Sequence, residues 1–360
     1  MKFKVMKRET ESLRMHLDGK RRIMTYGAGT CANDIKQILE EYGYQLNYSI
    51  VDASYCDGNT YMDKRGGVTE VVSLEKLDPP YDSQVDAIVW AIGSLEKFRR
   101  CMEEEKAEME YLLFWDMGFW KDKDYSSIHK KEFLEASELL CDEYSQKVFW
   151  SYLKALKGDV EDDILYSTSG TYFNELTKGK KRGAFVDCGS YDGMSAVDYM
   201  KFLNQECLVY AFEPDKDNYQ NLVKNMGKRS NFICLNKGCY SSEGMFSFVS
   251  NDDASCLQET GNNVVEVTTI DKTVGDEKVA FIKMDVEGAE LEALKGARKV
   301  IERDMPVLAI SAYHRQEDLI TLIPYINNLH NGSERYDLYL RHHSVIQSEL
   351  VIYAIPEIYQ

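Results

Sequence analysis

The sequence has no long apolar run, no cysteines spaced CxxC, and too few basic residues to balance the acidic ones. Its longest apolar stretch, residues 85–92, is interrupted by Asp86 and is far shorter than the ~20 residues of a membrane span. Nine cysteines, an odd number, argue against a disulfide framework and a zinc site. The basic residues of 1–14 are not followed by an apolar segment, so no secretory signal is expected. These absences predict a cytoplasmic protein.

Acidic side chains outnumber basic ones by 60 to 43, which gives a formal net charge of -17. Proteins that follow a phosphodiester backbone normally carry a basic surface. We therefore expect neither nucleic acid nor a membrane surface as partner, which leaves a small-molecule or glycan substrate. Whether the chain forms a homo-oligomer is left open. A length of 360 residues and a hydrophobic content of 44% favour two domains.

The first third of the chain alternates between strand and helix patterns. Residues 1–20 are expected to form a short charged helix. The stretches "RRIMTY", "LNYSIVD" and "VDAIVWAIG" read as strands, and "NDIKQILEEYGY" as a helix. This alternation predicts a small Rossmann-like α/β domain over residues 1–125. One apolar stripe then predicts a helical connector over residues 126–180, formed by Phe133, Ala136, Leu140, Tyr144 and Val148.

Two motifs in the first domain are ambiguous. The loop "GAGTCA" at 27–32 satisfies G-x-G-x-x-G/A, and Asp52 follows twenty residues after Ala32, which is formally a dinucleotide fingerprint. Alone it is a weak signal, and a bound nucleotide or nucleotide sugar, no ligand, and a redox NAD all stay open. "DPPY" at 78–81 matches a tetrapeptide of adenine methyltransferases, but "SLEKL" before it makes it a loop that stops a helix.

From residue 181 the alternation restarts in longer form and predicts the second domain, 181–360. A hairpin is expected to be inserted at 245–250 and 264–270, and "YDLYLRHHS" and "LVIYAIP" give two terminal strands. A sheet of about seven strands with a C-terminal hairpin is the arrangement of many methyltransferases. The other strands are expected at 184–187, 208–212, 231–235, 279–284 and 306–311.

The stretch "AFVDCGSYDG" at 184–193 carries the features of a cofactor site. Asp187 ends a strand, and Gly189 and Gly193 allow the backbone to approach a ligand that a Cβ would exclude. The next strand, "LVYAFEP", ends on Glu213, where a carboxylate can accept hydrogen bonds from both ribose hydroxyls. The spacing D-x-G-x-x-x-G suits S-adenosyl-L-methionine better than a dinucleotide, because no pyrophosphate needs a helix N-terminus.

The stretch "FIKMDVEGAELEALKGA" at 281–297 gathers Lys283, Asp285 and Glu287 at a strand end, where burying charges without function is costly. Together with "FVDCGSYDG", "YAFEP", "VTTID" and "PVLAISAYH", it resembles the FkbM-type family of S-adenosylmethionine-dependent methyltransferases over residues 166–354. The resemblance implies a class I methyltransferase sheet. It implies cofactor contacts at Asp187, Gly189, Gly193 and Glu213, with Tyr172 as a further candidate for the cofactor pocket.

The same resemblance implies a methyl-acceptor region at Asp285, Glu287 and His314. Since histidine titrates near neutral pH, His314 is favoured as the base that takes the acceptor's proton, with Asp285 orienting the acceptor or the imidazole. No metal is assigned. A metal-assisted mechanism, with Asp285 and Glu287 holding Mg²⁺, stays open but lacks an obvious third ligand. The predicted activity is O-methylation of a glycan, nucleotide sugar or secondary metabolite.

Two other functions compete with this prediction. The chain could be a nucleotide-sugar-binding protein with an inactive methyltransferase domain, or an NAD-dependent oxidoreductase that uses the first domain. The complete set of acidic and glycine residues at 187–213 speaks against the first. The absence of a Tyr-x-x-x-Lys pair after the strands of the first domain speaks against the second.

Overall fold

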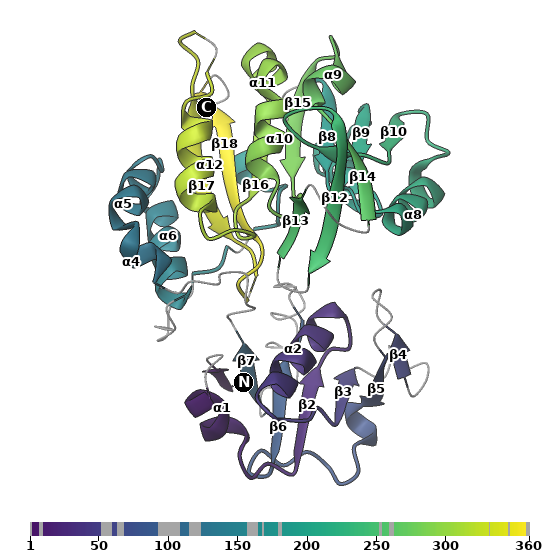
Figure 1. The fold of residues 1–360 in the computed structure, drawn as a ribbon, viewed down its shortest axis with the longest axis vertical. Helices are drawn as coiled ribbons and strands as arrows, with labels where there is room; N and C mark the ends of the chain where they lie inside the picture. The colour runs from purple at the N-terminus through teal and green to yellow at the C-terminus, as the bar shows by residue number, and fades with distance from the viewer. Residues whose placement is uncertain are drawn as a thin grey trace. The chain divides into compact units, whose positions relative to one another are not determined.

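The computed structural model describes most of the chain, and its described residues fall into two compact units. The first unit comprises residues 1–118, 154–164 and 344–348, and the second comprises residues 119–153, 165–343 and 349–360. Each unit contains its own sheet (Figure 1). The described residues are 2–6, 10–51, 60–62, 68–92, 109–114, 124–156, 165–167, 169–178, 182–251, 254–258, 263–330, 332–344 and 346–357.

The first unit is built on a seven-stranded sheet with the order β1-β7-β6-β2-β3-β5-β4. All of its pairings are parallel except that of β4 with β5. The buried face of α2 packs on the sheet through Ile35, Ile38 and Leu39. Its elements are β1 (Lys2–Met6), α1 (Thr10–Leu17), β2 (Arg22–Tyr26), α2 (Thr30–Glu41), β3 (Tyr48–Val51), β4 (Thr60–Met62), β5 (Val68–Ser73), η2 (Leu74–Lys76), β6 (Asp86–Trp90) and β7 (Glu110–Phe114).

One prediction for this unit was wrong. Residues 2–6 form the edge strand β1, paired in parallel with β7, where the sequence predicted part of a helix; α1 occupies only the second half of that segment. The "DPPY" stretch lies in a loop after η2, as expected, and Arg22 donates hydrogen bonds to the carbonyl oxygens of Pro79 and Pro80. Arg22 also pairs with Asp86 at 2.5 Å.

The glycine loop of the first unit joins β2 to α2. Gly27 has a φ of +112°, and a Cβ there would lie 2.9 Å from the carbonyl oxygen of Ala91, so chain packing alone accounts for this glycine. Gly29 precedes the first residue of α2, and Ala32 is fully buried. Asp52 lies outside the described residues. The packing explains Gly27 and assigns no ligand to the loop.

The second unit is an α/β fold with a large mixed sheet, in the order β10-β9-β8-β15-β16-β18-β17. β18 runs antiparallel to both of its neighbours. The sheet strands are β8 (Ala184–Cys188), β9 (Val209–Phe212), β10 (Phe232–Leu235), β15 (Val279–Met284), β16 (Val307–Ser311), β17 (Tyr336–His342) and β18 (Leu350–Pro356). These seven agree with the predicted strands to within a residue or two.

Burial explains this strand order. Every residue of β8, β9, β15 and β16 is buried, as expected for central strands covered on both faces. Burial alternates along β17, as expected for an edge strand with one covered face. The chain reverses its direction of travel across the sheet between β8 and β15. Ligands of doubly wound sheets bind outside the carboxyl ends of the strands at such a switch point.

A second, four-stranded sheet in the order β11-β14-β12-β13 stands beside the large one (Figure 1). The predicted inserted hairpin corresponds to β12 and β14, which pair antiparallel. Its strands are β11 (Gly238–Cys239), β12 (Gly244–Asn251), β13 (Ala254–Gln258) and β14 (Asn263–Thr268). The α-helices and η4 of this part of the chain are α4 (Tyr125–Ile128), α5 (Lys130–Glu138), α6 (Glu143–Leu156), η4 (Glu175–Thr177), α7 (Met194–Leu203), α8 (Lys216–Met226), α9 (Ile270–Val274), α10 (Glu290–Gly296), α11 (Arg298–Asp304) and α12 (Asp318–Asn327).

The helices predicted as a connector pack within the second unit. α5 contacts α12, which in turn contacts β17. Arg341 on β17 pairs with Asp142, just before α6, at 2.6 Å. The apolar stripe of α5 and α6 is buried at Phe133, Ala136 and Val148. No helix in the described part of the chain is both long and apolar enough to cross a membrane.

Candidate active site

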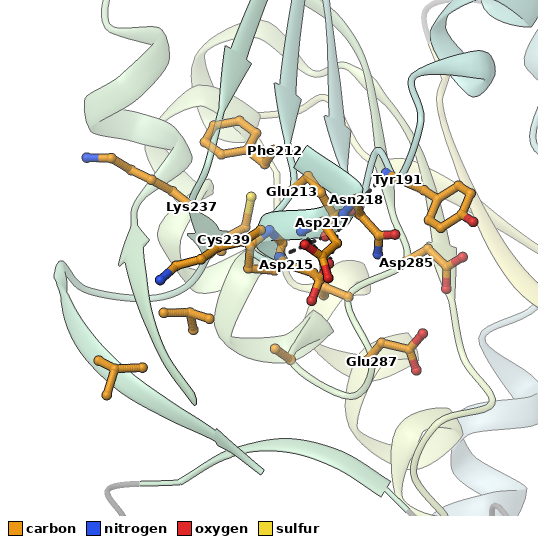
Figure 2. A pocket seen from close by; sticks show the side chains of 18 residues that line it. Tyr191, Phe212, Glu213, Asp215, Asp217, Asn218, Lys237, Cys239, Asp285 and Glu287 are labelled. Atoms are coloured by element: carbon orange, nitrogen blue, oxygen red, sulfur yellow. Dashed lines mark hydrogen bonds between the residues drawn. The ribbon is translucent and has the colours of Figure 1, made fainter. Parts of the chain in front are cut away.

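A cavity of about 700 Å³ opens at the carboxyl ends of β8, β9 and β15, beside the four-stranded sheet. Its size is within the usual range for small-molecule sites. One wall, here called the Glu213 side, consists of Gly189, Tyr191, Glu213 and Asp215. Another is formed by Asp285 and Glu287 from the turn after β15. Figure 2 shows these acidic side chains around the same space.

Glu213 is held by the backbone on the Glu213 side. Its Oε2 accepts a hydrogen bond from the N–H of Tyr191 at 2.8 Å, and its Oε1 accepts one from the N–H of Asp215 at 2.9 Å. Each oxygen keeps a further lone pair for a ligand. The residue is only 5% exposed, and burial raises the pKa of its carboxyl to about 7. Glu213 is therefore a fixed acceptor that faces the cavity.

The two predicted glycines have different roles. Gly189 lines the cavity with a φ of +76°, and a Cβ there would lie 1.9 Å from the carbonyl oxygen of Asp285. Gly193 is not among the residues that line the cavity. Its φ is +83°, and a Cβ would contact Leu222 and Met226, so this glycine allows α7 to pack closely against α8.

Asp187 is fully buried and does not line the cavity. Ser195 donates a hydrogen bond to its Oδ2. The Nζ atom of Lys283 lies 3.3 Å from its Oδ1 and donates to the carbonyl oxygen of Gly189 at 2.7 Å. Asp187 and Lys283 therefore hold the backbone turn at Gly189 in place. Asp187 can act on a ligand only through that turn.

Asp285 is the centre of the second wall. Its Oδ2 accepts a hydrogen bond from the hydroxyl of Tyr172 at 3.1 Å, and its Oδ1 accepts one from the hydroxyl of Tyr313 at 3.3 Å. Burial acts to raise the pKa of Asp285, but the charges of Lys283 and His314 hold it below its usual value. Asp285 is thus an ionised, oriented carboxylate. Tyr172, predicted to line the cofactor pocket, bonds to this side instead and is not among the lining residues.

His314 lies behind Asp285, with its side chain 5% exposed. Its Nδ1 is 2.9 Å from Oε1 of Glu290, and its Nε2 is 3.5 Å from Oδ1 of Asp285 and 3.4 Å from Oε2 of Glu287. We call the three carboxylates and His314 the carboxylate cluster. The structure brings together all three residues that were predicted for the acceptor region.

The surroundings of His314 do not favour the role of base that was predicted for it. Burial acts to lower the pKa of His314, but the surrounding carboxylates, Glu290 first, outweigh it and raise that pKa to about 10. As long as no other cation lies beside it, an imidazole with this pKa is protonated at neutral pH and cannot accept another proton. His314 also is not among the residues that line the cavity. This arrangement favours His314 as a residue that positions its neighbours over His314 as the general base.

Sequence reasoning missed Glu290 and Tyr313. The sequence held a signal for Glu290, because its spacing places it on the same helix face as Ala293 and Leu294. All three residues are buried, so a glutamate lies on the core face of α10. Tyr313 directly precedes His314 after β16, and nothing in its spacing distinguished it from a core aromatic. Both contacts join residues more than twenty positions apart in the chain.

Known proteins are similar to the part of the chain that contains this site. Residues 187–341 match the family model of the methyltransferase FkbM domain. The hexuronic acid methyltransferase AglP of Haloferax volcanii is 34% identical over 139 residues, and the match covers 35% of this chain and 55% of that protein. The chain therefore spans about half the length of this curated relative.

A similar fold is found in a crystal structure of methyltransferase FkbM from Methylobacillus flagellatus KT. It is 23% identical, the match covers 98% of this chain and 94% of that one, and the TM-score is 0.58. The resemblance stated from the motifs is confirmed over the part that holds Gly189, Glu213 and Asp285. Residues 187–341 carry a methyltransferase domain of the FkbM family.

Proposed function

We propose that the chain is an S-adenosyl-L-methionine-dependent methyltransferase that methylates a sugar hydroxyl, with both substrates in the cavity between Glu213 and Asp285. One observation carries this proposal. A single space is lined both by a fixed carboxylate with spare acceptor capacity and by an oriented carboxylate at the neighbouring strand end. The first suits a ribose diol, and the second suits a reacting hydroxyl.

The residues present fit this cofactor. Glu213 has acceptor capacity for the two ribose hydroxyls, and Gly189 is part of the cavity lining. The acidic lining suits a cationic sulfonium. When bound, the cofactor supplies a methyl group that is already activated, so the chain's own task is alignment and proton removal. Gly193 and Asp187 support this side through packing and the turn at Gly189.

In the reaction that we propose, the acceptor oxygen attacks the methyl carbon. A C–O bond forms, the S–C bond breaks, and its electron pair stays on sulfur as a thioether. Asp285, oriented by Tyr172 and Tyr313, accepts the hydroxyl proton, and Glu287 at the rim orients the acceptor. The acceptor is a glycan or nucleotide sugar, in line with the relative named for hexuronic acid.

Transfer of a labelled methyl group tests the proposal. Purified protein with methyl-labelled cofactor should methylate hydroxyls of hexuronic acid or hexose acceptors, with the position of the new methyl ether read by NMR. The same acceptors with that hydroxyl removed should stay unlabelled. Label on a carboxylate or an amine, or none on any sugar, would contradict the assignment to sugar oxygen.

A further inference from the structure

The carboxylate cluster contains more carboxylates than the proposed methyl transfer requires. Asp285, Glu287 and Glu290 surround His314. Asp318 and Glu349 lie close enough to interact with it, although burial raises the pKa of both carboxyl groups. The buried cation Lys283 is shared, because it pairs with Asp187 and also acts on Asp285. Buried charges are costly unless they are paired or coordinate a metal.

Two buried atoms of the cluster have no hydrogen-bond partner among the described residues. They are Oε2 of Glu290 and Nε2 of His314. Glu290 is 1% exposed, and its Oε1 is already used by Nδ1 of His314 and by the N–H of Val286. Because most buried polar atoms are paired, two such atoms in one cluster suggest a missing ligand.

The hydrogen bond at Nδ1 selects a tautomer. With Nδ1–H donated to Glu290, the neutral ring presents its Nε2 lone pair toward Asp285 and Glu287. A histidine that binds a metal commonly donates its other N–H to a carboxylate in this way. Nitrogen and carboxylate oxygen together are donors that divalent Mn²⁺, Fe²⁺ and Zn²⁺ accept.

We propose that Asp285, Glu290 and His314 bind a divalent metal ion. One ligand atom from each lies within 4.8 Å of the others. Glu287, with a side chain that is 58% exposed, stands at the rim within reach as a further ligand. The proposal supplies the third ligand that the sequence lacked for Asp285 and Glu287, and it departs from the assignment of no metal.

The role of the ion rests on the proposed function. Asp285 lines the cavity, so a cation there reaches the acceptor hydroxyl. A bound divalent ion lowers the pKa of an oxygen that it coordinates, which eases removal of the hydroxyl proton. It also makes this acidic wall compatible with an anionic sugar acid. Binding of the ion itself does not depend on the identity of the acceptor.

Mn²⁺ titration of the full-length, EDTA-stripped protein tests the site, with free Mn²⁺ followed by electron paramagnetic resonance. The wild type should bind one Mn²⁺ per chain. Because loss of a supporting group already costs about 10–100-fold in metal affinity, His314→Gln and Asp285→Asn should each weaken binding at least about tenfold. Asp198→Asn removes one charge on the exposed face of α7 and should bind like the wild type.

S-adenosylhomocysteine affinity is the control for correct folding of these variants. It should stay within about twofold of the wild-type value, because the substituted side chains do not contact Glu213. If neither cluster variant folds, the wild type decides: Mn²⁺ should broaden the ring signals of one buried histidine and leave those of the half-buried His129 sharp. No stoichiometric binding, or His314→Gln binding like the wild type, overturns the metal site. Methyl transfer that persists in EDTA without Mn²⁺ binding would remove the metal and keep the proposed function. Mn²⁺ binding without methyl transfer would keep the metal site and remove the proposed function.

Discussion

The two sides of the cavity are built in different ways. Glu213 is fixed by N–H groups from residues close to strand ends, and Gly189 owes its role to its own backbone angle. Asp285 is instead fixed by side chains from distant parts of the chain, Tyr172 and Tyr313, and backed by His314. Local backbone geometry is readable from sequence, and side-chain convergence is not. The two sides should also fail differently when mutated.

The largest effect is expected at the point where the sides meet. Gly189→Ala places a Cβ against the carbonyl oxygen of Asp285 and strains a positive φ, so it should cost more than about 4 kcal/mol of stability and abolish ligand binding. Gly332→Ala has a similar φ of +62° with open space and should cost only about 1–2 kcal/mol. Thermal unfolding compares the two. Equal losses would show that contact with Asp285 is unimportant.

Removing the charge of Asp285 should affect catalysis and spare the Glu213 side. Asp285→Asn should lower turnover by about 10²–10⁴-fold, the usual range for a group that takes a proton. Its S-adenosylhomocysteine affinity should change by no more than about twofold. Steady-state rates and calorimetry measure these separately, with Asp198→Asn as the matched control. Near-wild-type turnover would leave alignment alone to explain the reaction.

Glu213→Ala should give the reverse pattern, with a loss in cofactor affinity. It removes a buried acceptor that is ionised above its pKa, so S-adenosylhomocysteine should bind about 1.5–3 kcal/mol more weakly. The exposed Glu175, paired with Lys178 on the surface, provides the control Glu175→Ala, which should leave binding unchanged. Calorimetry of both variants is the measurement. Unchanged affinity in Glu213→Ala would place the ribose elsewhere.

The smallest effect is a pH dependence confined to the Glu213 side. Burial is the main cause that raises the pKa of Glu213 to about 7. The charges of Asp215 and Asp187 also raise this pKa, and the charge of Lys283 lowers it. The carboxyl is therefore protonated below pH 7 and has less acceptor capacity for the ribose. S-adenosylhomocysteine affinity should fall from pH 8 to pH 6, by up to about tenfold per unit below the pKa. Glu213→Gln should remove this slope, and a flat wild-type profile would contradict it.

The sequence predicted the central strands well because β8, β9, β15 and β16 are mostly apolar, with a charged residue only at Asp187 in β8 and Lys283 in β15. It failed at β1, where "KFKVM" alternates lysine with apolar residues and becomes a strand only by pairing with β7, more than a hundred residues away. At the end of the predicted strand "YDLYLRHHS", His342 and His343 are buried. Their burial depends on partners such as Tyr152 and Tyr353, which no local pattern reveals.

The same limit applies to the site. The residue types and strand-end positions of Gly189, Glu213 and Asp285 were enough to predict that they lie close together, because parallel strands bring their carboxyl ends to one edge of the sheet. The electrostatic state of His314 was not readable, since it depends on Glu290, whose helix folds back beneath the same edge. The sequence therefore predicted a base at a histidine whose neighbours favour its positively charged form.

The central claim is that the Glu213 side binds S-adenosyl-L-methionine. Calorimetric titration of the wild-type chain with S-adenosylhomocysteine and, in parallel, with NAD tests it most directly. The account predicts saturable binding of S-adenosylhomocysteine that Glu213→Ala weakens. A chain that ignores S-adenosylhomocysteine and binds NAD would contradict it.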